Sequence, residues 1–258
     1  MDITDFGLHL FSLTGRVAVV TGGNTGLGRA FTVALAAAGA EVLVAALAPD
    51  DGTTAELVRA AGGRMVFVQA DITAPGAPAE VIGRCVREWG RIDVLVNSAG
   101  ICELAPVEEF DRAPWDRMVA VNLTAAFELA HEAAKVMIGQ RSGKIVNIAS
   151  LFSYLGGRTS PAYAATKAGL VGLTRAYCDE LAEHNVQVNA IAPGYFATAI
   201  TQATRSDPDA NRRVLEHIPT GRWGQPADLM GALVFLAGPA SDYVNGQVLV
   251  VDGGYLVR

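Results

Sequence analysis

The sequence predicts an α/β fold in which a doubly wound parallel sheet of seven strands is covered by helices on both faces. Short runs rich in Val and Ile alternate with longer helical patterns, a glycine-rich turn follows the first run, and the length of 258 residues suits one such domain. Strands that are separated by helices pair in parallel through right-handed crossovers. We therefore expect one Rossmann-type domain over residues 1–258, with strand order 3-2-1-4-5-6-7.

Seven segments have the composition of buried strands. Val and Ile dominate them, as expected where helices cover both faces of a parallel sheet. In such a sheet a ligand lies at the carboxyl ends of the strands, near the point where the strand order reverses. The segments, in chain order, are RVAVVT (16–21), EVLVAA (41–46), MVFVQ (65–69), IDVLVN (92–97), KIVNIAS (144–150), VQVNAIA (186–192) and QVLVVD (247–252).

Composition and charge exclude several classes of protein. The chain is 51% hydrophobic and 18% charged, which excludes disorder, and its net charge of −6 argues against a nucleic-acid or anionic-membrane surface. The first residues, MDITDFGLHLF, are acidic, and no apolar run approaches the roughly 18 residues that span a bilayer. Cys85, Cys102 and Cys178 lack metal-ligand spacing and are expected to be free thiols, with Cys102 buried and inert. We expect a cytoplasmic protein without a metal, nucleic-acid or membrane partner.

The first strand runs into a glycine-rich turn, TGGNTGLGRAF (21–31), which opens a helix. Gly22, Gly26 and Gly28 let the backbone approach a pyrophosphate, and the helix N-terminus adds amide hydrogens and the positive end of its dipole. The spacing Gly-x3-Gly-x-Gly differs from the common dinucleotide pattern, so the place of the turn between a strand and an apolar helix carries the argument. A plain glycine-rich turn is the alternative interpretation.

The segment SLFSYLGGRTSPAYAATK (150–167) brings a hydroxyl, a phenol and an ammonium group together. Tyr163 and Lys167 are four residues apart and share one face of a helix. Lowering the phenol pKa from about 10 by about three units requires about 4 kcal/mol, which a positive charge about 4 Å away supplies at an effective dielectric near 20. Ser150, at the end of the fifth strand, is placed to hydrogen-bond the same substrate oxygen. The trio predicts general acid/base chemistry, although Tyr-x3-Lys also occurs by accident on surface helices.

These motifs resemble those of the short-chain dehydrogenase/reductase family, and the resemblance covers nearly the whole chain. It implies an NAD(P)-dependent oxidoreductase in which Tyr163 exchanges a proton, Ser150 holds the substrate oxygen, and Lys167 binds the nicotinamide ribose and lowers the phenol pKa. It also implies that Asn122 supports a water relay and that the protein is a homotetramer. The matching pieces are Thr21–Gly28, Asn97-Ser98-Ala99-Gly100, Asn122, Ser150, Tyr163 with Lys167, and Pro193-Gly194.

The resemblance also assigns contacts with the dinucleotide. Asp71 is expected to bond the adenine with Ile72 beside it, and Thr198 to bond the nicotinamide carboxamide. A turn role for Asp71 and a helix N-cap role for Thr198 are the alternatives. The second strand ends at Ala46 and Leu47, which are neither acidic nor basic, so the choice between NAD and NADP stays open. The other expected cofactor-binding residues are Gly22, Asn24, Gly26, Leu27, Gly28, Asn97, Ala99, Gly100, Tyr163, Lys167, Pro193 and Gly194.

The substrate is expected to be a sugar acid, because several tracts resemble the dehydrogenases of the family that act on gluconate, 2-deoxy-gluconate or 2-keto-3-deoxy-gluconate. Those tracts include FSLTGRVAVVTGGNTGLG, NAIAPGYFAT and IPTGRWGQPADL. Ser150, Arg158 and Tyr195 are the candidate substrate residues, and Arg158 would pair with the carboxylate unless it is only a surface charge. The segment at about 195–225 interrupts the alternation of strands and helices and is expected to form a lid. A 3-oxoacyl thioester substrate and a catalytically silent nucleotide sensor are the alternatives.

Overall fold

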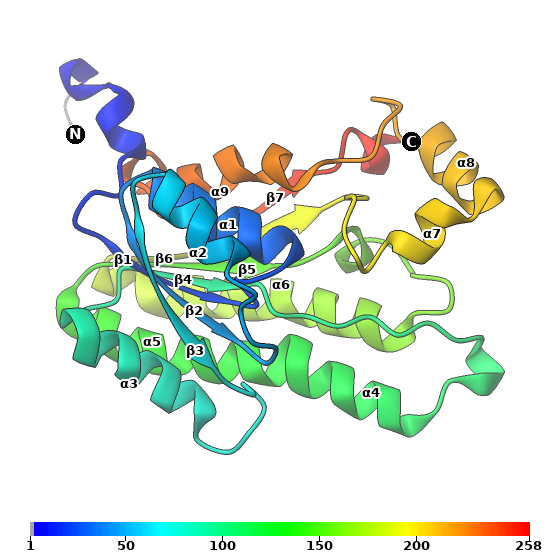
Figure 1. Cartoon of the computed structure of the whole chain (residues 1–258), viewed down its shortest axis with the longest axis horizontal. Helices are drawn as coiled ribbons and strands as arrows, with labels where there is room; N and C mark the ends of the chain where they lie inside the picture. The colour runs from blue at the N-terminus through cyan, green and yellow to red at the C-terminus, as the bar shows by residue number, and fades with distance from the viewer. Residues whose placement is uncertain (1–2) are drawn as a thin grey trace.

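The computed structural model describes residues 3–258 and has a seven-stranded sheet at its centre (Figure 1). The strands pair in parallel in the order β3-β2-β1-β4-β5-β6-β7. The predicted α/β fold and strand order are therefore confirmed. The strands are β1 (Val17–Thr21), β2 (Glu41–Ala46), β3 (Arg64–Gln69), β4 (Val94–Asn97), β5 (Gly143–Ile148), β6 (Val186–Pro193) and β7 (Val248–Val251).

Helices cover both faces of the sheet (Figure 1). Helices α1, α2 and α9 lie on one face, and α3, α5 and α6 lie on the other. A short π-helix, the π-turn of Ala120–Thr124, joins α4 to α5, so the two form one long helical stretch. The helices are α1 (Gly26–Ala37), α2 (Thr53–Ala60), α3 (Ala77–Trp89), α4 (Arg112–Val119), α5 (Ala125–Gln140), α6 (Pro161–Leu181), α7 (Gln202–Ser206), α8 (Pro208–His217) and α9 (Met230–Ala237).

The core consists of apolar clusters on the two sides of the sheet. Successive side chains of a strand point to opposite faces. In β1, Ala18 and Val20 pack in the cluster that contains Phe31 of α1, whereas Val17 and Val19 pack in the cluster on the other face. Because both faces are buried, the strands carry continuous apolar runs rather than an alternating pattern.

The loops that follow β1, β4, β5 and β6 meet at the carboxyl edge of the sheet. Thr21 joins two of them, since its Oγ1 accepts hydrogen bonds from the backbone N–H groups of Ser98 (3.0 Å) and Ala99 (3.1 Å). Strand β5 ends at Ile148, so Ser150 begins a 3-10 turn instead of ending the strand as the sequence suggested. These loops bring the predicted motifs to one place.

The segment at about 195–225 contains α7 and α8 (Figure 1). Phe196 and Gly224 form an isolated parallel bridge, which joins the two ends of the segment. Within residues 3–258, none of the helices combines the length and apolar character needed to cross a bilayer. The same residues contain no group of three or more His, Cys, Asp or Glu side chains arranged to hold a metal ion.

Candidate active site

The glycine loop between β1 and α1 has a backbone suited to glycine. Gly22 and Gly26 have φ angles of 64° and 50°, in the left-handed region. A Cβ atom on Gly28 would lie 2.1 Å from the carbonyl oxygen of Gly22, and one on Gly22 would lie 3.1 Å from the Cα of Ala99. The loop therefore folds tightly against its neighbours. It leads directly into the first turn of α1, where free N–H groups attract anions.

A cleft of about 240 Å³ opens beside this loop at the carboxyl edge of the sheet. Loops from four strands and the start of α6 contribute to its lining. The sequence motifs are separated by more than a hundred residues, yet most of them meet here. The predicted residues that line the cleft are Gly22, Gly26, Leu27, Gly28, Ala99, Gly100, Ser150, Tyr163, Lys167, Pro193, Gly194 and Thr198.

Ser150 follows β5, Tyr163 lies at the start of α6, and both line the cleft. Tyr163 is in the first turn of α6, which begins at Pro161. Its ring meets Phe152 edge-on, with 5.8 Å between the ring centroids. The Oγ of Ser150 accepts a hydrogen bond from the backbone N–H of Phe152 (3.2 Å). The phenol and the hydroxyl are therefore both held in place at the cleft wall.

Lys167 lies one turn after Tyr163 and is buried. Its Nζ donates a hydrogen bond to the carbonyl oxygen of Ile148 (2.7 Å) and lies 5.5 Å from the centroid of the Tyr163 ring. Burial lowers the pKa of Lys167 to about 8, although the charge of Cys102 favours the ammonium form. The predicted sharing of one helix face is confirmed by this geometry.

The pKa of Tyr163 differs from the expectation. Burial and, next, the charge of Cys102 raise the pKa of Tyr163 to about 12, while the hydrogen bond with Ser150 lowers it. We expected Lys167 to lower the pKa of Tyr163, but without a bound dinucleotide it does not. Its ammonium is directed to the carbonyl of Ile148, and the loss of water around the phenol outweighs any attraction. The phenol is thus protonated at neutral pH.

Cys102 follows two residues after the loop 97–100 and is a partly buried free thiol. Its inertness stays a prediction. Burial raises the pKa of the Cys102 thiol, and a contact with the hydroxyl of Ser160, with 3.8 Å between Sγ and Oγ, lowers it. Phe196 and Ile200 line the cleft and were not predicted.

Asn122 lies next to the cleft, in the π-turn between α4 and α5. Its Oδ1 accepts a hydrogen bond from the backbone N–H of Ile101 (2.8 Å), and its Nδ2 donates to the carbonyl of the same residue (2.9 Å). A Cβ atom on Gly100 would lie 3.4 Å from the Asn122 Oδ1 and 3.6 Å from the Lys167 Nζ. Asn122 therefore fixes the loop that passes beside the ammonium group.

Two predicted cofactor residues have buried side chains that bond elsewhere in the protein. Asn24 donates from Nδ2 to the carbonyl of Ala48 (3.0 Å), which ties the glycine loop to the end of β2. Asn97 donates from Nδ2 to the Oδ1 of Asn147 (2.9 Å) inside the sheet. The amide groups of these side chains thus support the cleft from behind and do not line it.

The structure shows the surroundings of Asp71 and Thr198, for which alternatives were open, and of Ile72, while their contacts with a dinucleotide stay predictions. Asp71 is exposed and accepts hydrogen bonds from the N–H (2.9 Å) and Oγ1 (2.7 Å) of Thr73, as in a turn, and Ile72 is buried in the core. Thr198 lies in the cleft, 3.9 Å from the position of a Cβ on Gly26. The N-cap position of α7 belongs to Thr201, so Thr198 does not cap that helix.

The structure separates two candidate substrate residues from the cleft. Tyr195 lines a neighbouring cavity of about 130 Å³ and packs against Trp223 and Tyr255, with ring centroids 5.6 Å and 5.1 Å away. Its chain neighbour Phe196 lines both cavities and lies between them. Arg158 is exposed and has no ion pair with any residue of the described chain 3–258.

Known proteins are similar over almost the full length of the chain. A family model described as enoyl-(acyl carrier protein) reductase matches residues 22–256. The uncharacterized oxidoreductase YgcW of Escherichia coli is 61% identical over 257 residues, covering 100% of this chain and 98% of the relative. The 2-dehydro-3-deoxy-D-gluconate 5-dehydrogenase of E. coli is 46% identical, covering 97% and 99%. The crystal structure of a gluconate 5-dehydrogenase from Burkholderia cenocepacia with NADP and tartrate superposes with a TM-score of 0.93 at 37% identity, covering 97% and 99%.

Proposed function

Because the chain belongs to the short-chain dehydrogenase/reductase family, an NAD(P)-dependent oxidoreductase family acting on CH–OH groups, we propose that it transfers a hydride between nicotinamide and a secondary alcohol or ketone of a sugar acid. The convergence of Ser150, Tyr163 and Lys167 in one cleft carries this proposal. The substrate class rests on relatives: similar proteins act on 2-dehydro-3-deoxy-D-gluconate and 5-keto-D-gluconate, and one was crystallised with tartrate. We propose one catalytic domain over residues 1–258.

The proposed roles follow from the positions of the three side chains. Tyr163 exchanges the proton with the substrate oxygen as a general acid/base. Ser150, which lines the same cleft, holds the same oxygen. Lys167 carries the buried cation that binds the ribose and attracts negative charge on the phenol. Asn122 positions the loop at Gly100 beside that cation.

The residues around the cleft fit a dinucleotide. Three glycines of the loop, Gly22, Gly26 and Gly28, line the cleft and leave the backbone accessible there, and the first turn of α1 offers its free N–H groups to a pyrophosphate. When bound, the nicotinamide ring supplies or accepts the hydride. The end of β2 has no acidic side chain at Ala46 or at the exposed Leu47 that would repel a 2′-phosphate. We therefore propose that the protein accepts NADP as well as NAD.

The lid is proposed to be the segment at about 195–225. Its first part lines the cleft, and its α7 is tied to that part by side chains. Arg205 donates from Nη2 to the carbonyl of Thr198 (3.0 Å), and Thr201 donates from Oγ1 to the carbonyl of Phe196 (2.6 Å). A movement of α7 would therefore move the cleft wall with it. This coupling is what a lid over a substrate requires.

We propose a homotetramer in which α5 and α6 contribute to the contacts. Phe127 of α5 is exposed, and its ring lies 5.9 Å from His131 and 6.3 Å from Tyr177 of α6. Exposed aromatic groups of this kind are typical of interfaces. Light scattering after size-exclusion chromatography measures the mass, and the monomer mass of 26.9 kDa in solution would contradict the proposal.

A substrate panel tests the proposed function. NAD and NADP are each assayed with gluconate, 2-deoxy-gluconate, 2-keto-3-deoxy-gluconate, neutral polyols and a 3-oxoacyl thioester. We expect turnover of at least one sugar acid and little turnover of the thioester. Turnover of the thioester alone would replace the sugar acid with the alternative substrate. Dinucleotide binding without any turnover would favour the nucleotide sensor.

The variant Arg158→Ala extends this panel to the carboxylate. Arg158 is exposed on the loop between Ser150 and Tyr163, so its loss should not disturb the core. If it pairs with the substrate, KM should rise about tenfold or more for carboxylate substrates and little for neutral polyols. Arg87→Ala, which removes an exposed arginine of α3, is the matched control. Equal effects on both substrate classes would dismiss Arg158 from substrate binding.

Alcohol oxidation is expected to accelerate as the pH rises. Burial and, next, the charge of Cys102 raise the pKa of Tyr163 to about 12, so the phenol is protonated near neutrality. Oxidation needs the phenolate as a base, and its population grows about tenfold per pH unit below the pKa. Carbonyl reduction needs the protonated phenol, which is already present.

Initial rates in both directions should show oxidation rising from about pH 6 to about pH 9 and reduction level or falling. An oxidation rate that falls over this range would contradict the role of the phenol.

A further inference from the structure

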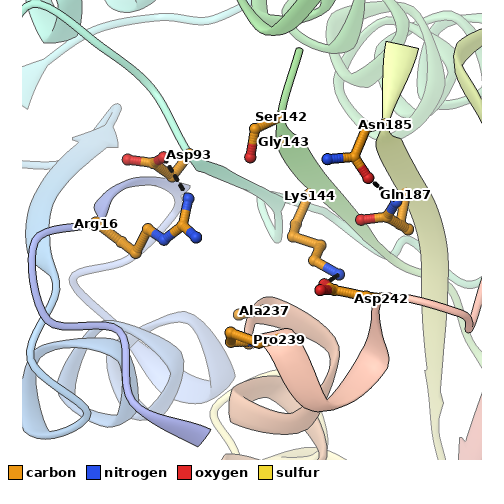
Figure 2. Close-up of a pocket in the computed structure, with 11 residues that line it drawn as sticks. Arg16, Asp93, Ser142, Gly143, Lys144, Asn185, Gln187, Ala237, Pro239 and Asp242 are labelled. Carbon is orange, nitrogen blue, oxygen red and sulfur yellow. Dashed lines mark hydrogen bonds and ion pairs between the residues drawn. The ribbon is translucent and has the colours of Figure 1, made fainter. Parts of the chain in front are cut away.

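A further cavity lies at the amino-terminal edge of the sheet, opposite the cleft. Figure 2 shows the residues that line it. The cavity has a volume of about 90 Å³ and is surrounded by the amino ends of the four strands whose carboxyl ends form the cleft. Arg16 and Asp93 directly precede β1 and β4, while Lys144 and Gln187 are the second residues of β5 and β6. The cavity has room for about three water molecules or an ion of similar size.

Lys144 is a buried cation with an exposed partner. It interrupts an apolar strand, and its side chain is only 10% exposed. Its Nζ donates to the Oδ1 of Asp242 (2.7 Å) and to the Oγ of Ser241 (3.4 Å). The side chain of Asp242 is 58% exposed, so water competes for its carboxylate and weakens the pair. The buried ammonium therefore has a counter-charge that another anion can replace.

Arg16 is the second cation that faces the cavity (Figure 2). Its Nη1 donates to the Oδ1 of Asp93 (3.1 Å). Asp93 is already held by two hydrogen bonds from Arg91 (2.8 and 2.6 Å) and one from the backbone N–H of Val17 (2.9 Å). The Asp93 carboxylate is thus shared by the guanidinium groups of Arg16 and Arg91. Within the described residues 3–258, the other nitrogens of the Arg16 guanidinium have no hydrogen-bond partner.

The residues that line the cavity carry two cations, Arg16 and Lys144, and two carboxylates, Asp93 and Asp242. Arg91, which lies outside the lining, also pairs with the Asp93 carboxylate, so the positive charge of Arg16 is only partly compensated. The cations also interact with each other: burial lowers the pKa of Lys144, its bond with Asp242 raises it, and the charge of Arg16 lowers it. An anion between Lys144 and Arg16 would relieve this repulsion.

Polar side chains complete the wall of the cavity on the side of β6. Gln187 donates from Nε2 to the Oδ1 of Asn185 (3.3 Å), and Ser142 places its hydroxyl beside the start of β5. Amide and hydroxyl donors next to two cations are suited to an oxyanion, whose several oxygen atoms each accept hydrogen bonds. The polar lining excludes an apolar ligand.

We propose that this cavity binds a small oxyanion through the Lys144 ammonium and the Arg16 guanidinium, with the Asp242 carboxylate displaced to solvent. Phosphate, sulfate and a small carboxylate share the required chemistry. The site is separate from the cleft, and its existence does not depend on the proposed reaction. Binding to the folded state alone stabilises the protein in proportion to the logarithm of the ligand concentration above Kd.

Thermal unfolding at constant ionic strength tests the proposal. Sodium phosphate, sulfate and acetate are each titrated against chloride, and Tm is recorded for the wild type, Lys144→Met, Asp242→Asn and Arg16→Gln. We expect a saturable rise in Tm with at least one oxyanion, lost in Lys144→Met and weakened in Arg16→Gln. Asp242→Asn removes the competing carboxylate and should lower the apparent Kd about two- to fivefold. A response to phosphate or sulfate but not acetate assigns a tetrahedral anion, and the reverse assigns a carboxylate.

Matched variants separate this site from other effects of anions. Lys135→Met and Glu132→Gln alter an exposed lysine–glutamate pair elsewhere (2.6 Å) and should leave the Kd unchanged. Phosphate can also bind to the free N–H groups at the start of α1 in the cleft, and a rise in Tm that comes from that site would persist in Lys144→Met. An equal rise in Tm for all variants, or one matched by chloride, overturns the proposal. Weaker binding by Asp242→Asn also overturns it, and this exposed variant decides the matter if Lys144→Met does not fold.

Discussion

Turnover is expected to fall about 10²- to 10⁴-fold when Tyr163 is replaced with Phe, because the variant loses the only group proposed to exchange a proton with the substrate oxygen. The ring itself should stay in place, since Phe keeps the edge-on contact with Phe152 at the cleft wall. Dinucleotide affinity should therefore be largely retained. Steady-state kinetics measures kcat, and a titration followed by fluorescence measures dinucleotide binding.

Tyr154→Phe is the matched control for this experiment. Tyr154 lies in the connection between β5 and α6, nine residues before Tyr163, but its side chain is exposed and lies outside the cleft lining. Its loss of a hydroxyl should leave both turnover and binding unchanged. If Tyr163→Phe loses dinucleotide binding, the phenol has a structural role. Unchanged turnover in that variant would reject acid/base catalysis by Tyr163.

The second large effect is expected for Gly28→Ala in the glycine loop. The added Cβ would lie 2.1 Å from the carbonyl oxygen and 2.8 Å from the carbonyl carbon of Gly22. Both are backbone atoms, so the loop has to shift, and overpacking of this kind costs about 1 to 3 kcal/mol. A shifted loop also moves the N–H groups that we assign to the pyrophosphate. We expect a lower midpoint of urea unfolding and dinucleotide binding weakened about tenfold or more.

Gly139→Ala provides the comparison for Gly28→Ala. Gly139 lies near the end of α5, and a Cβ there would meet no atom within 4 Å apart from its chain neighbours and the backbone of its own helix. Alanine in a helix is favoured over glycine by about 1 kcal/mol, so this variant should be slightly more stable. Normal dinucleotide binding by Gly28→Ala would show that the pyrophosphate does not lie on this loop. Equal stability of the two variants would show that the loop relaxes without cost.

The local motifs of the site were predictable because their geometry is local. Tyr163 and Lys167 are placed together by helical spacing alone, and the turn at Gly22 and Gly28 follows from its position between a strand and a helix. Cys102 illustrates the limit. Its contact with Ser160 joins two parts of the chain that are far apart in the sequence, so no local pattern predicts it.

The sequence by itself determined the seven strands, their order and the edge of the sheet that carries the cleft, because continuous Val-rich runs and parallel crossovers leave few other arrangements. Only the tertiary structure decided which polar side chains enter the cleft. Asn24 and Asn97 donate hydrogen bonds to Ala48 and Asn147 inside the protein, and Tyr195 lines a different cavity. The partners of these side chains come from segments far away in the chain. The tertiary structure also decided the pKa of Tyr163, since the loss of water around a phenol depends on everything packed against it.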